Sequence, residues 1–405
     1  MDFKKLAKGI FGGSLILLVT FNLFNAINYF FHFVMARMLG AADYGVLATL
    51  MSIVYIFNVP LESIQTIVTK YVSHEKSFGK IKNIARKVLK EGFKISLKLF
   101  LVYLIIMVFV GMFLKIDYPL LALTGILIFY VFSSPVNRGV LQGKKYFNTL
   151  GINMIIEAIT KLLFAILLVF LGWKVYGAIT GVIIGVFFAF ILSFYHLKDV
   201  FSSKESYSQM KGIYGYSMPV FTIIFTVMIF FSLDIILAKA FFPSNLAGQY
   251  AIASMIAKII FFGMSPISKA MFPLTSEASN NKKHSRDIFI KSLLILGLGV
   301  LVALLIVWFF PDLLVRIFSG QYYPEASRIV FLLAISTSLL SFTNLILLYR
   351  LSLGKVRRYW LILVFLIFEA ILLGLYHTTL IQFAATLLFL NMLFLFGSIF
   401  LFNRK

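Results

Sequence analysis

The sequence FVMARMLGAADYGVLATL (33–50) recurs in outline halfway along the chain, where it reads DIILAKAFFPSNLAGQYAIA (234–253). The matched residues are Ala36–Arg37 with Ala238–Lys239, Tyr44 with Tyr250, Pro60 with Pro266, Arg138 with Arg350, Gly143 with Gly354, and Glu157–Ala158 with Glu369–Ala370. Their spacing grows slowly along the chain, as loop insertions would make it grow. A repeat close to half the length of the 405 residues predicts a duplicated helical bundle, divided into residues 1–200 and 201–405.

Composition predicts that the bundle is an all-α polytopic membrane protein. Apolar residues make up 61% of the chain, charged residues only 13%, and the mean hydropathy is +0.99. A soluble domain carries about 25% charged residues. The runs long enough to cross a bilayer predict twelve transmembrane helices, at residues 10–36, 44–70, 97–115, 119–142, 148–172, 175–197, 213–237, 248–272, 288–310, 326–350, 359–377 and 379–402. Two lobes of six helices around a central cavity form a standard architecture of secondary transporters.

The distribution of Lys and Arg predicts the orientation of these spans. Most of the 37 Lys and Arg fall in loops on one side of the predicted membrane. The loops of the other side contain Arg37, Lys115, Lys174, Lys239, Arg316 and Arg328. By the positive-inside tendency, both termini are cytoplasmic in the plasma or inner membrane. The net charge of +22 follows mainly from this topology and from attraction to anionic lipid, and needs no nucleic acid to explain it. Residues 74–98 have the spacing of a basic amphipathic helix on the inner surface.

A few ionisable residues fall inside or at the edge of the predicted spans. The bases are Lys70, Arg138, Lys161, Lys258, Lys269 and Arg350, and the acids are Glu62, Glu157, Asp234 and Glu369. Such residues usually face a bundle interior or a wet cavity, because a charge in lipid is costly. Near a helix end, a long side chain can instead reach the interface, and this second reading applies to Lys70, Lys269 and Arg350. Lys161 and Lys258 lie near mid-span, so the interior reading is favoured for them.

Helical spacing groups the polar residues further. Ser254, Lys258, Ser265 and Lys269 form one narrow stripe on the span 248–272. Asn25 and Asn28 share a face of the first span and Gln65 lies on a polar face of the second, where such residues either bind a ligand or hold helices together. Glu157 and Lys161 have the i, i+4 spacing of an ion pair.

Basic residues inside a membrane bundle favour an anionic cargo. Lys and Arg are strong donors to a diphosphate or a carboxylate, whereas they repel drug cations. The chain contains no Cys, its five His are scattered, and no glycine-rich phosphate loop is present, so we expect no metal site and no cofactor.

Three stretches resemble one known family. Residues 33–50 are similar to the AR-x-LG-x-x-x-YG signature of polysaccharide flippases in the multidrug/oligosaccharidyl-lipid/polysaccharide (MOP) exporter superfamily. NRGVLQGKKYF (137–147) resembles the RG-x-LQG-x-x-x-F element of that family, and residues 234–253 resemble its helix 7 to 8 junction. The resemblance extends over nearly the whole chain.

The resemblance implies a MATE-like parallel repeat that works by alternating access. Its cargo would be an oligosaccharide on undecaprenyl or dolichyl pyrophosphate, flipped across the membrane for cell-surface polysaccharide or glycan assembly. The sugar and pyrophosphate would enter the cationic cavity while the polyprenyl tail stays in lipid. By position, the residues expected to line this cavity are Lys161, Lys258, Arg138, Lys269, Arg350, Asn25, Asn28 and Gln65.

Coupling and the competing functions remain open at this point. Glu62, Glu157 and Glu369 are candidates for coupling transport to H+ or Na+, and structural pairing explains them equally well. A MATE-like cation-coupled antiporter of drugs or small molecules is the alternative function. The first span lacks the acid that drug exporters of the superfamily usually place there. An enzyme is disfavoured, because the longest predicted outer loop, residues 311–325, offers only Asp312 and Glu325 as carboxylates and little room for a domain.

Overall fold

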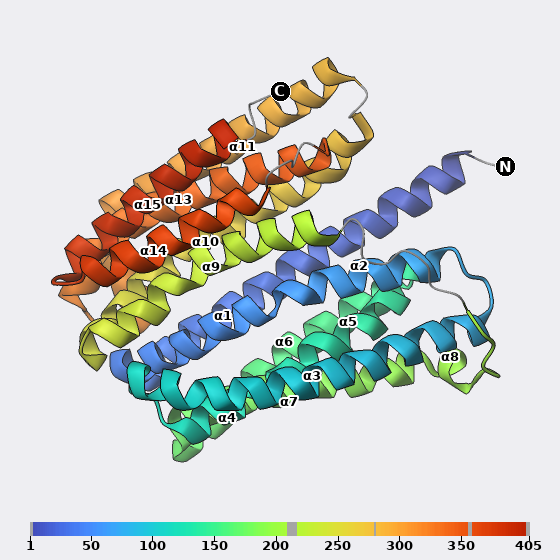
Figure 1. Cartoon of the computed structure of the whole chain (residues 1–405), viewed down its shortest axis with the longest axis horizontal. Helices are drawn as coiled ribbons and strands as arrows, with labels where there is room; N and C mark the ends of the chain where they lie inside the picture. The colour runs from blue at the N-terminus through green and yellow to red at the C-terminus, as the bar shows by residue number, and fades with distance from the viewer. Residues whose placement is uncertain (1–2, 209–216, 279–280, 355–358, 402–405) are drawn as a thin grey trace. The chain divides into compact units, whose positions relative to one another are not determined.

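The computed structural model describes residues 3–208, 217–278, 281–354 and 359–401, and all regular structure in these ranges is helical (Figure 1). The described chain forms two compact units. Unit 1 contains residues 3–32 and 57–208, and unit 2 contains residues 33–56 together with everything from residue 217 onward. Within each unit the long helices run alongside one another.

Helix α1 (Phe3–Phe57) contributes residues to both units, and it bends at a glycine in the part that belongs to unit 2. Gly40 has φ 72° and ψ 173°, a backbone conformation that a residue with a Cβ rarely adopts. Beyond the bend, Gly45 lies against Gly248 so closely that a Cβ added at Gly248 would lie 1.9 Å from the carbonyl oxygen of Ala41. Tyr44 is fully buried beside them. Within the sequence 33–50, Gly40 therefore makes the bend, Gly45 makes a close helix contact within unit 2, and Tyr44 is buried next to that contact.

The remaining helices of unit 1 follow in chain order. They are α2 (Val59–Ser73), α3 (Phe78–Leu114), α4 (Tyr118–Gly125), α5 (Leu127–Gly143), α6 (Phe147–Leu168), the π-helical turn Val169–Trp173, α7 (Lys174–His196) and α8 (Lys198–Ser202). Gly172 within the turn has φ 89° and separates α6 from α7. The break lies where the sequence predicted the end of one span at 172 and the start of the next at 175.

Small residues bring α6 and α7 into close contact. Gly181 lies over Ala165, and a Cβ at Gly185 would come within 2.6 Å of the backbone nitrogen of Lys161. The i, i+4 pair of glycines is the small-residue pattern that lets membrane helices approach closely. It fixes the position of Lys161 on α6 relative to α7.

The helices of unit 2 are α9 (Ser217–Phe241), α10 (Ser244–Glu277), α11 (Lys282–Phe309), α12 (Pro311–Ser319), α13 (Pro324–Ser352), the short 3₁₀ helix Tyr359–Ile362, α14 (Leu363–Leu375) and α15 (Leu380–Leu401). Helix α13 packs against α10, α11 and α15, while α14 packs against α9 and α15. Fully buried Phe230 on α9 stacks on Phe394 on α15, with ring centroids 4.4 Å apart.

Nine helices in the described residues are long and apolar enough to cross a membrane, and the apolar stretch Tyr359–Leu375 is a shorter one. The outer faces of two of them are strongly apolar. Phe109 and Met112 on α3 are 66% and 67% exposed, and Leu294 and Leu298 on α11 are 67% and 65% exposed. Contiguous exposed apolar surface of this kind belongs in lipid. The predicted all-α, multi-pass membrane class is confirmed.

Two regions that the sequence places between the spans contain helices. The predicted basic amphipathic helix of residues 74–98 is present from Phe78 onward, and α3 continues from it without a break through the next predicted span. Its apolar face, including Ile81 and Ala85, packs in the core of unit 1. The predicted outer loop 311–325 contains the helix α12, which begins with Pro311 at its first position.

The basic face of α3 holds the segment that follows α8. Lys82 donates to the carbonyl oxygen of Ser203 at 2.8 Å, and Arg86 forms an ion pair with Glu205 at 2.6 Å. Hydrogen bonds from Asn83 and from Arg86 lower the pKa of the Glu205 carboxyl below its ordinary value. The attachment is therefore complete at neutral pH and weakens as the pH falls through that lowered pKa.

Candidate functional site

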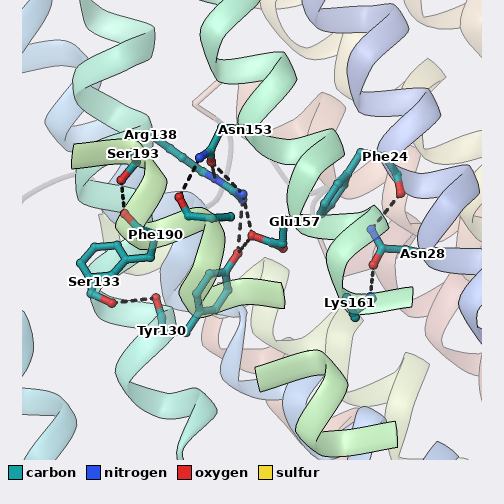
Figure 2. A network of polar contacts seen from close by, with 11 residues as sticks. Phe24, Asn28, Tyr130, Ser133, Arg138, Asn153, Glu157, Lys161, Phe190 and Ser193 are labelled. Carbon is teal, nitrogen blue, oxygen red and sulfur yellow. Dashed lines mark hydrogen bonds and ion pairs between the residues drawn. The ribbon is translucent and has the colours of Figure 1, made fainter. Parts of the chain in front are cut away.

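Arg138 on α5 lies in a polar network buried inside unit 1 (Figure 2). Its Nη2 atom is 2.6 Å from Oε2 of Glu157 on α6, and Nη1 donates to the Tyr130 hydroxyl at 3.2 Å. The Tyr130 hydroxyl in turn donates to the same carboxylate oxygen at 2.8 Å. Asn153 accepts two further hydrogen bonds from the guanidinium, each 3.3 Å long. The charge of Arg138 is thus neutralised, and four of its five N–H donors are hydrogen-bonded.

The packing of α5 on α2 sets the position of Arg138. A Cβ on Gly139 would lie 2.7 Å from Cβ of Val68, and one on Gly143 would lie 2.8 Å from Cβ of Val72. These two glycines are one helical turn apart, so α5 lies flat against α2. Gln142 on the same face accepts a hydrogen bond from Gln65 at 2.8 Å.

Lys161 lies one turn beyond Glu157 on α6 and has different surroundings (Figure 2). Its ammonium donates to the Asn28 side-chain oxygen and lies 4.8 Å from the centre of the Phe31 ring. Asn28 is oriented by a hydrogen bond from its amide nitrogen to the Phe24 carbonyl oxygen, 2.8 Å long. Lys161 is only 6% exposed, and in the described part of the chain no carboxylate lies within ion-pair distance of it. Its direct contacts are an amide oxygen and an aromatic ring, and the charge of Glu157 acts on it from one helical turn away.

In unit 2, Lys258 on α10 is paired with Asp234 on α9. Nζ of Lys258 is 2.9 Å from Oδ1 of Asp234 and lies 4.7 Å from the centre of the Phe231 ring. The other carboxylate oxygen of Asp234 accepts hydrogen bonds from Tyr250 at 3.1 Å and from Ser254 at 2.8 Å. Both charged residues are nearly fully buried, so the pair is a desolvated, well-satisfied salt bridge.

Glu369 on α14 is also buried in unit 2, with an exposed fraction of 0%. Neither of its carboxyl oxygens has a hydrogen-bond partner among the described residues. Most buried polar groups in proteins are hydrogen-bonded, so this carboxyl is unusual.

A model of the family described as "Polysaccharide biosynthesis protein" matches residues 34–328. The chain belongs to this family. The predicted resemblance is confirmed, and the structure supplies reasons for two of its motifs. In residues 33–50, Gly40 makes the bend of α1, while Arg37 donates to the carbonyl oxygen of Ile317 at 3.0 Å. In residues 137–147, Arg138 makes the buried ion pair, and Gly139 and Gly143 make the contact with α2.

This family member is 25% identical to the uncharacterized membrane protein MJ1375 of Methanocaldococcus jannaschii, over 78% of this chain and 79% of that protein. Among solved structures, it resembles a multidrug resistance MATE family transporter of the MOP superfamily. The inward-facing form gives a TM-score of 0.74 at 13% identity, covering 94% of this chain and 92% of that one. The outward-facing form gives 0.65 at 13% identity, covering 97% and 96%.

A third similar structure is a MOP superfamily transporter from Pyrococcus furiosus, with a TM-score of 0.64 and 13% identity over 95% of this chain and 93% of that one. That transporter is described by the statement that the reverse polarity of its binding pocket suggests a different function. At such identities the likeness establishes the fold. The chain has the MATE-like fold of MOP superfamily transporters, and the expectation that it is not an enzyme agrees with this family and fold.

The other predicted site residues are spread over both units of this family member. In unit 1, Asn25 on α1 is half-buried and Glu62 on α2 is exposed. In unit 2, Lys269 on α10 is exposed and Arg350, at the end of α13, is half-buried. The structure brings Arg138 together with Glu157, and Lys161 together with Asn28.

The sequence identifies which charged residues lie within the spans, but it does not predict which of them form ion pairs with one another. The i, i+4 spacing favoured an ion pair of Glu157 with Lys161, whereas Glu157 makes its ion pair with Arg138, from the neighbouring helix. Asp234 was recognised as an acid within a span, but its pairing with Lys258 was not predicted. The available signal was electrostatic: a Lys buried at mid-span needs a nearby counter-charge, and Asp234 lies within the preceding span of the same half.

Proposed function

We propose that this protein moves a polyprenyl-pyrophosphate-linked oligosaccharide across the cytoplasmic membrane by alternating access. The observation that carries the proposal is Lys161, a buried ammonium without a carboxylate at ion-pair distance among the described residues. A buried cation whose direct contacts are an amide and an aromatic ring gains from an anionic ligand, because an ion pair then replaces a hydrogen bond to a neutral acceptor.

The buried bases Arg138 and Lys258 differ from Lys161 because each forms an ion pair. Arg138 and Lys258 already have carboxylate partners at 2.6 and 2.9 Å, so in this proposal they shape the charge around the headgroup. Lys161 provides the direct contact, and Asn28 and Gln65 provide amides for sugar hydroxyls. The remaining members of the proposed site are Asn25, Lys269 and Arg350.

The architecture proposed for this function has twelve transmembrane helices in two lobes of six around a central cavity, residues 1–200 and 201–405. The nine candidate spans support this count. The candidate containing α1 and α2 bends at Gly40, the candidate containing α6 and α7 breaks at Gly172, and Tyr359–Leu375 is a further apolar helix. Counting each interrupted candidate as two spans and adding the shorter helix gives twelve.

The charge of the cargo distinguishes this proposal from the alternative. The proposed lipid-linked oligosaccharide is an anion, whereas the alternative is a cation-coupled antiporter of drugs. The fold is shared with multidrug transporters, but the reverse pocket polarity described for the Pyrococcus furiosus transporter is a precedent for a different function on this fold. A drug cation would have to enter beside an unpaired ammonium. The partners in this proposal are the lipid-linked oligosaccharide, membrane lipid, glycan-assembly proteins, and H+ or Na+ as the driving ion.

Transport in vesicles tests the function directly. Purified protein reconstituted in vesicles is expected to carry a fluorescent polyprenyl-diphosphate oligosaccharide between leaflets faster than protein-free vesicles. Binding of the same lipid is expected to weaken as salt rises, because screening reduces the attraction of the basic residues, and cationic dyes are not expected to compete. Exchange of a cationic drug for protons, with no movement of the lipid-linked sugar, would contradict the proposal and favour the antiporter.

Cysteine labelling tests the proposed orientation, with both termini in the cytoplasm. The chain contains no Cys, so single substitutions are not confounded by native thiols. A Cys at Lys115 or Gly320 is expected to react with an impermeant maleimide in intact cells, because both positions lie on the side poor in basic residues. A Cys at Lys82, or at Asn280 and Lys405, which lie outside the described residues, should react only after permeabilisation. Labelling of the Lys82 variant in intact cells would reverse the topology.

A further inference from the structure

Glu157 and Glu369, which occupy matched positions of the sequence repeat, have different surroundings in the two units. Glu157 in unit 1 accepts hydrogen bonds from Arg138 at 2.6 Å and from Tyr130 at 2.8 Å. Its counterpart, Glu369 in unit 2, is fully buried, and neither of its oxygens is hydrogen-bonded within the described chain. The first carboxylate is locked in an ion pair, whereas the second is available for another role.

The charged groups around Glu369 come from two helices of unit 2. Helix α9 contributes Asp234, and α10 contributes Lys258 and Tyr250; each of these interacts electrostatically with Glu369. The described residues of α15, which also packs on α14, include no titratable side chain. The remaining titratable groups on the elements packed against α14 are Lys239 on α9 and Tyr359 on the short helix before α14.

The charge balance of this cluster depends on Glu369. Asp234 and Lys258 neutralise each other at 2.9 Å, and Tyr250 and Ser254 occupy the second oxygen of Asp234. An ionised Glu369 would add one uncompensated negative charge to a desolvated site whose described donors are already bonded to Asp234, which is strongly unfavourable. A neutral carboxyl, with its proton bound, removes that charge.

The surroundings favour a proton over a metal cation as the ligand of Glu369. Hard cations need about six oxygen ligands. The described residues contain no cluster of three or more His, Asp or Glu side chains suited to a metal, and the oxygens of Asp234 are already engaged. A proton needs one carboxyl oxygen, and Glu369 has two that are unoccupied.

We propose that Glu369 is a proton-binding site, and that its proton occupancy switches the Glu369–Asp234–Lys258 cluster between a net charge of zero and one negative charge. On release, the O–H bond of the carboxyl breaks, the proton passes to water, and the carboxylate keeps the electron pair. The Lys258 ammonium stays protonated and is then shared by two carboxylates, which weakens its bond to Asp234 and loosens α9 from α10. The coupling of this switch to cargo movement rests on the proposed function, whereas proton binding itself does not.

Infrared difference spectroscopy on the purified full-length protein tests proton binding without any cargo. As the pH is raised, wild-type protein is expected to lose a carbonyl band of a protonated carboxyl group. Glu369→Gln is expected to abolish this band, and Glu369→Asp is expected to shift its frequency, which shows that a folded protein still carries the titrating acid. The matched controls are Glu157→Gln, at the repeat position, and Asp312→Asn, at an exposed carboxylate; both should keep the band. A band that is unchanged in the Glu369→Gln and Glu369→Asp variants would overturn the proposal.

Vesicle transport separates this inference from the proposed function. With wild-type protein, an imposed pH gradient is expected to change the rate of lipid-linked oligosaccharide movement severalfold, and Glu369→Gln should remove that response while Asp312→Asn keeps it. If the Glu369 band is present but no lipid-linked sugar moves, proton binding is supported and the proposed function fails. If the lipid moves but no band titrates at Glu369, the proton site is wrong and the proposed function survives.

Discussion

Replacement of Arg138 by Met is expected to lower the free energy of unfolding by about 3 to 5 kcal/mol, the cost of removing one partner from a buried ion pair. The variant keeps a side chain of similar length but leaves the Glu157 carboxylate buried, with the Tyr130 hydroxyl as its remaining hydrogen-bond donor in the described network. Thermal unfolding of the purified protein in detergent, followed by intrinsic fluorescence and by the fraction that stays monodisperse, measures this loss.

A double variant identifies the cause of that loss. Arg138→Met combined with Glu157→Leu removes both charges, so it should recover most of the stability lost by Arg138→Met alone. If the double variant is no more stable than the single variant, the ion pair is not the source of the effect. The packing of α5 on α2 through Gly139 and Gly143 would then be the better explanation.

Replacement of Lys161 by Met is expected to weaken cargo binding while the stability of the protein is kept, in contrast to Arg138→Met, which is expected to lower stability. In the described chain, Lys161 has no carboxylate at ion-pair distance that its removal would leave unpaired. If its ammonium contacts the diphosphate, its loss should cost about 1.5 to 3 kcal/mol of binding free energy, the value of a hydrogen bond to a charged group. Binding of a labelled polyprenyl-diphosphate oligosaccharide to the purified variant measures this, with the unfolding temperature determined on the same sample.

Two other lysines make the comparison specific. Lys90→Met removes an exposed charge on α3 and should change neither property. Lys258→Met leaves Asp234 without its cation and should lower stability, unlike Lys161→Met. Unaltered binding by the Lys161 variant would remove this residue from the proposed site, and a loss of stability equal to that of Lys258→Met would show that Lys161 is a structural residue.

Much of the helical framework could be predicted from the sequence, because hydropathy and helix-breaking residues act locally. The breaks near Gly40 and Gly172 fall between predicted spans, since glycine is the residue that tolerates positive φ. Two details of the helices outside the spans go beyond these local signals. The basic segment is continuous with the span that follows it, because no residue between Lys80 and Leu114 interrupts helical geometry. Residues 311–319 are amphipathic rather than uniformly apolar, so a search for membrane spans does not identify α12.

The buried charged residues could be predicted from the sequence, but their pairings could not. A charged residue at mid-span is conspicuous in sequence, and Lys161, Lys258, Glu157 and Glu369 are all buried. Which of them meet depends on the rotation and register of neighbouring helices. The contact of Arg138 with Glu157 joins α5 to α6, and sequence spacing along one helix gave more weight to Lys161. The unpaired state of Glu369 is equally a property of packing, because its repeat counterpart has the same residue type and the opposite environment.

The contribution of α1 to both units limits how the protein can be divided. Residues 33–56 belong to unit 2, although the chain on both sides of them belongs to unit 1. A cut between residues 208 and 217 would therefore produce a C-terminal fragment that lacks the segment seated on Gly248, and an N-terminal fragment that displays this segment with its apolar face uncovered. Neither fragment could bury its own surface alone. When the two fragments are produced together, we expect them to associate by fragment complementation, because the N-terminal fragment contains the helical segment that completes the fold of the C-terminal fragment.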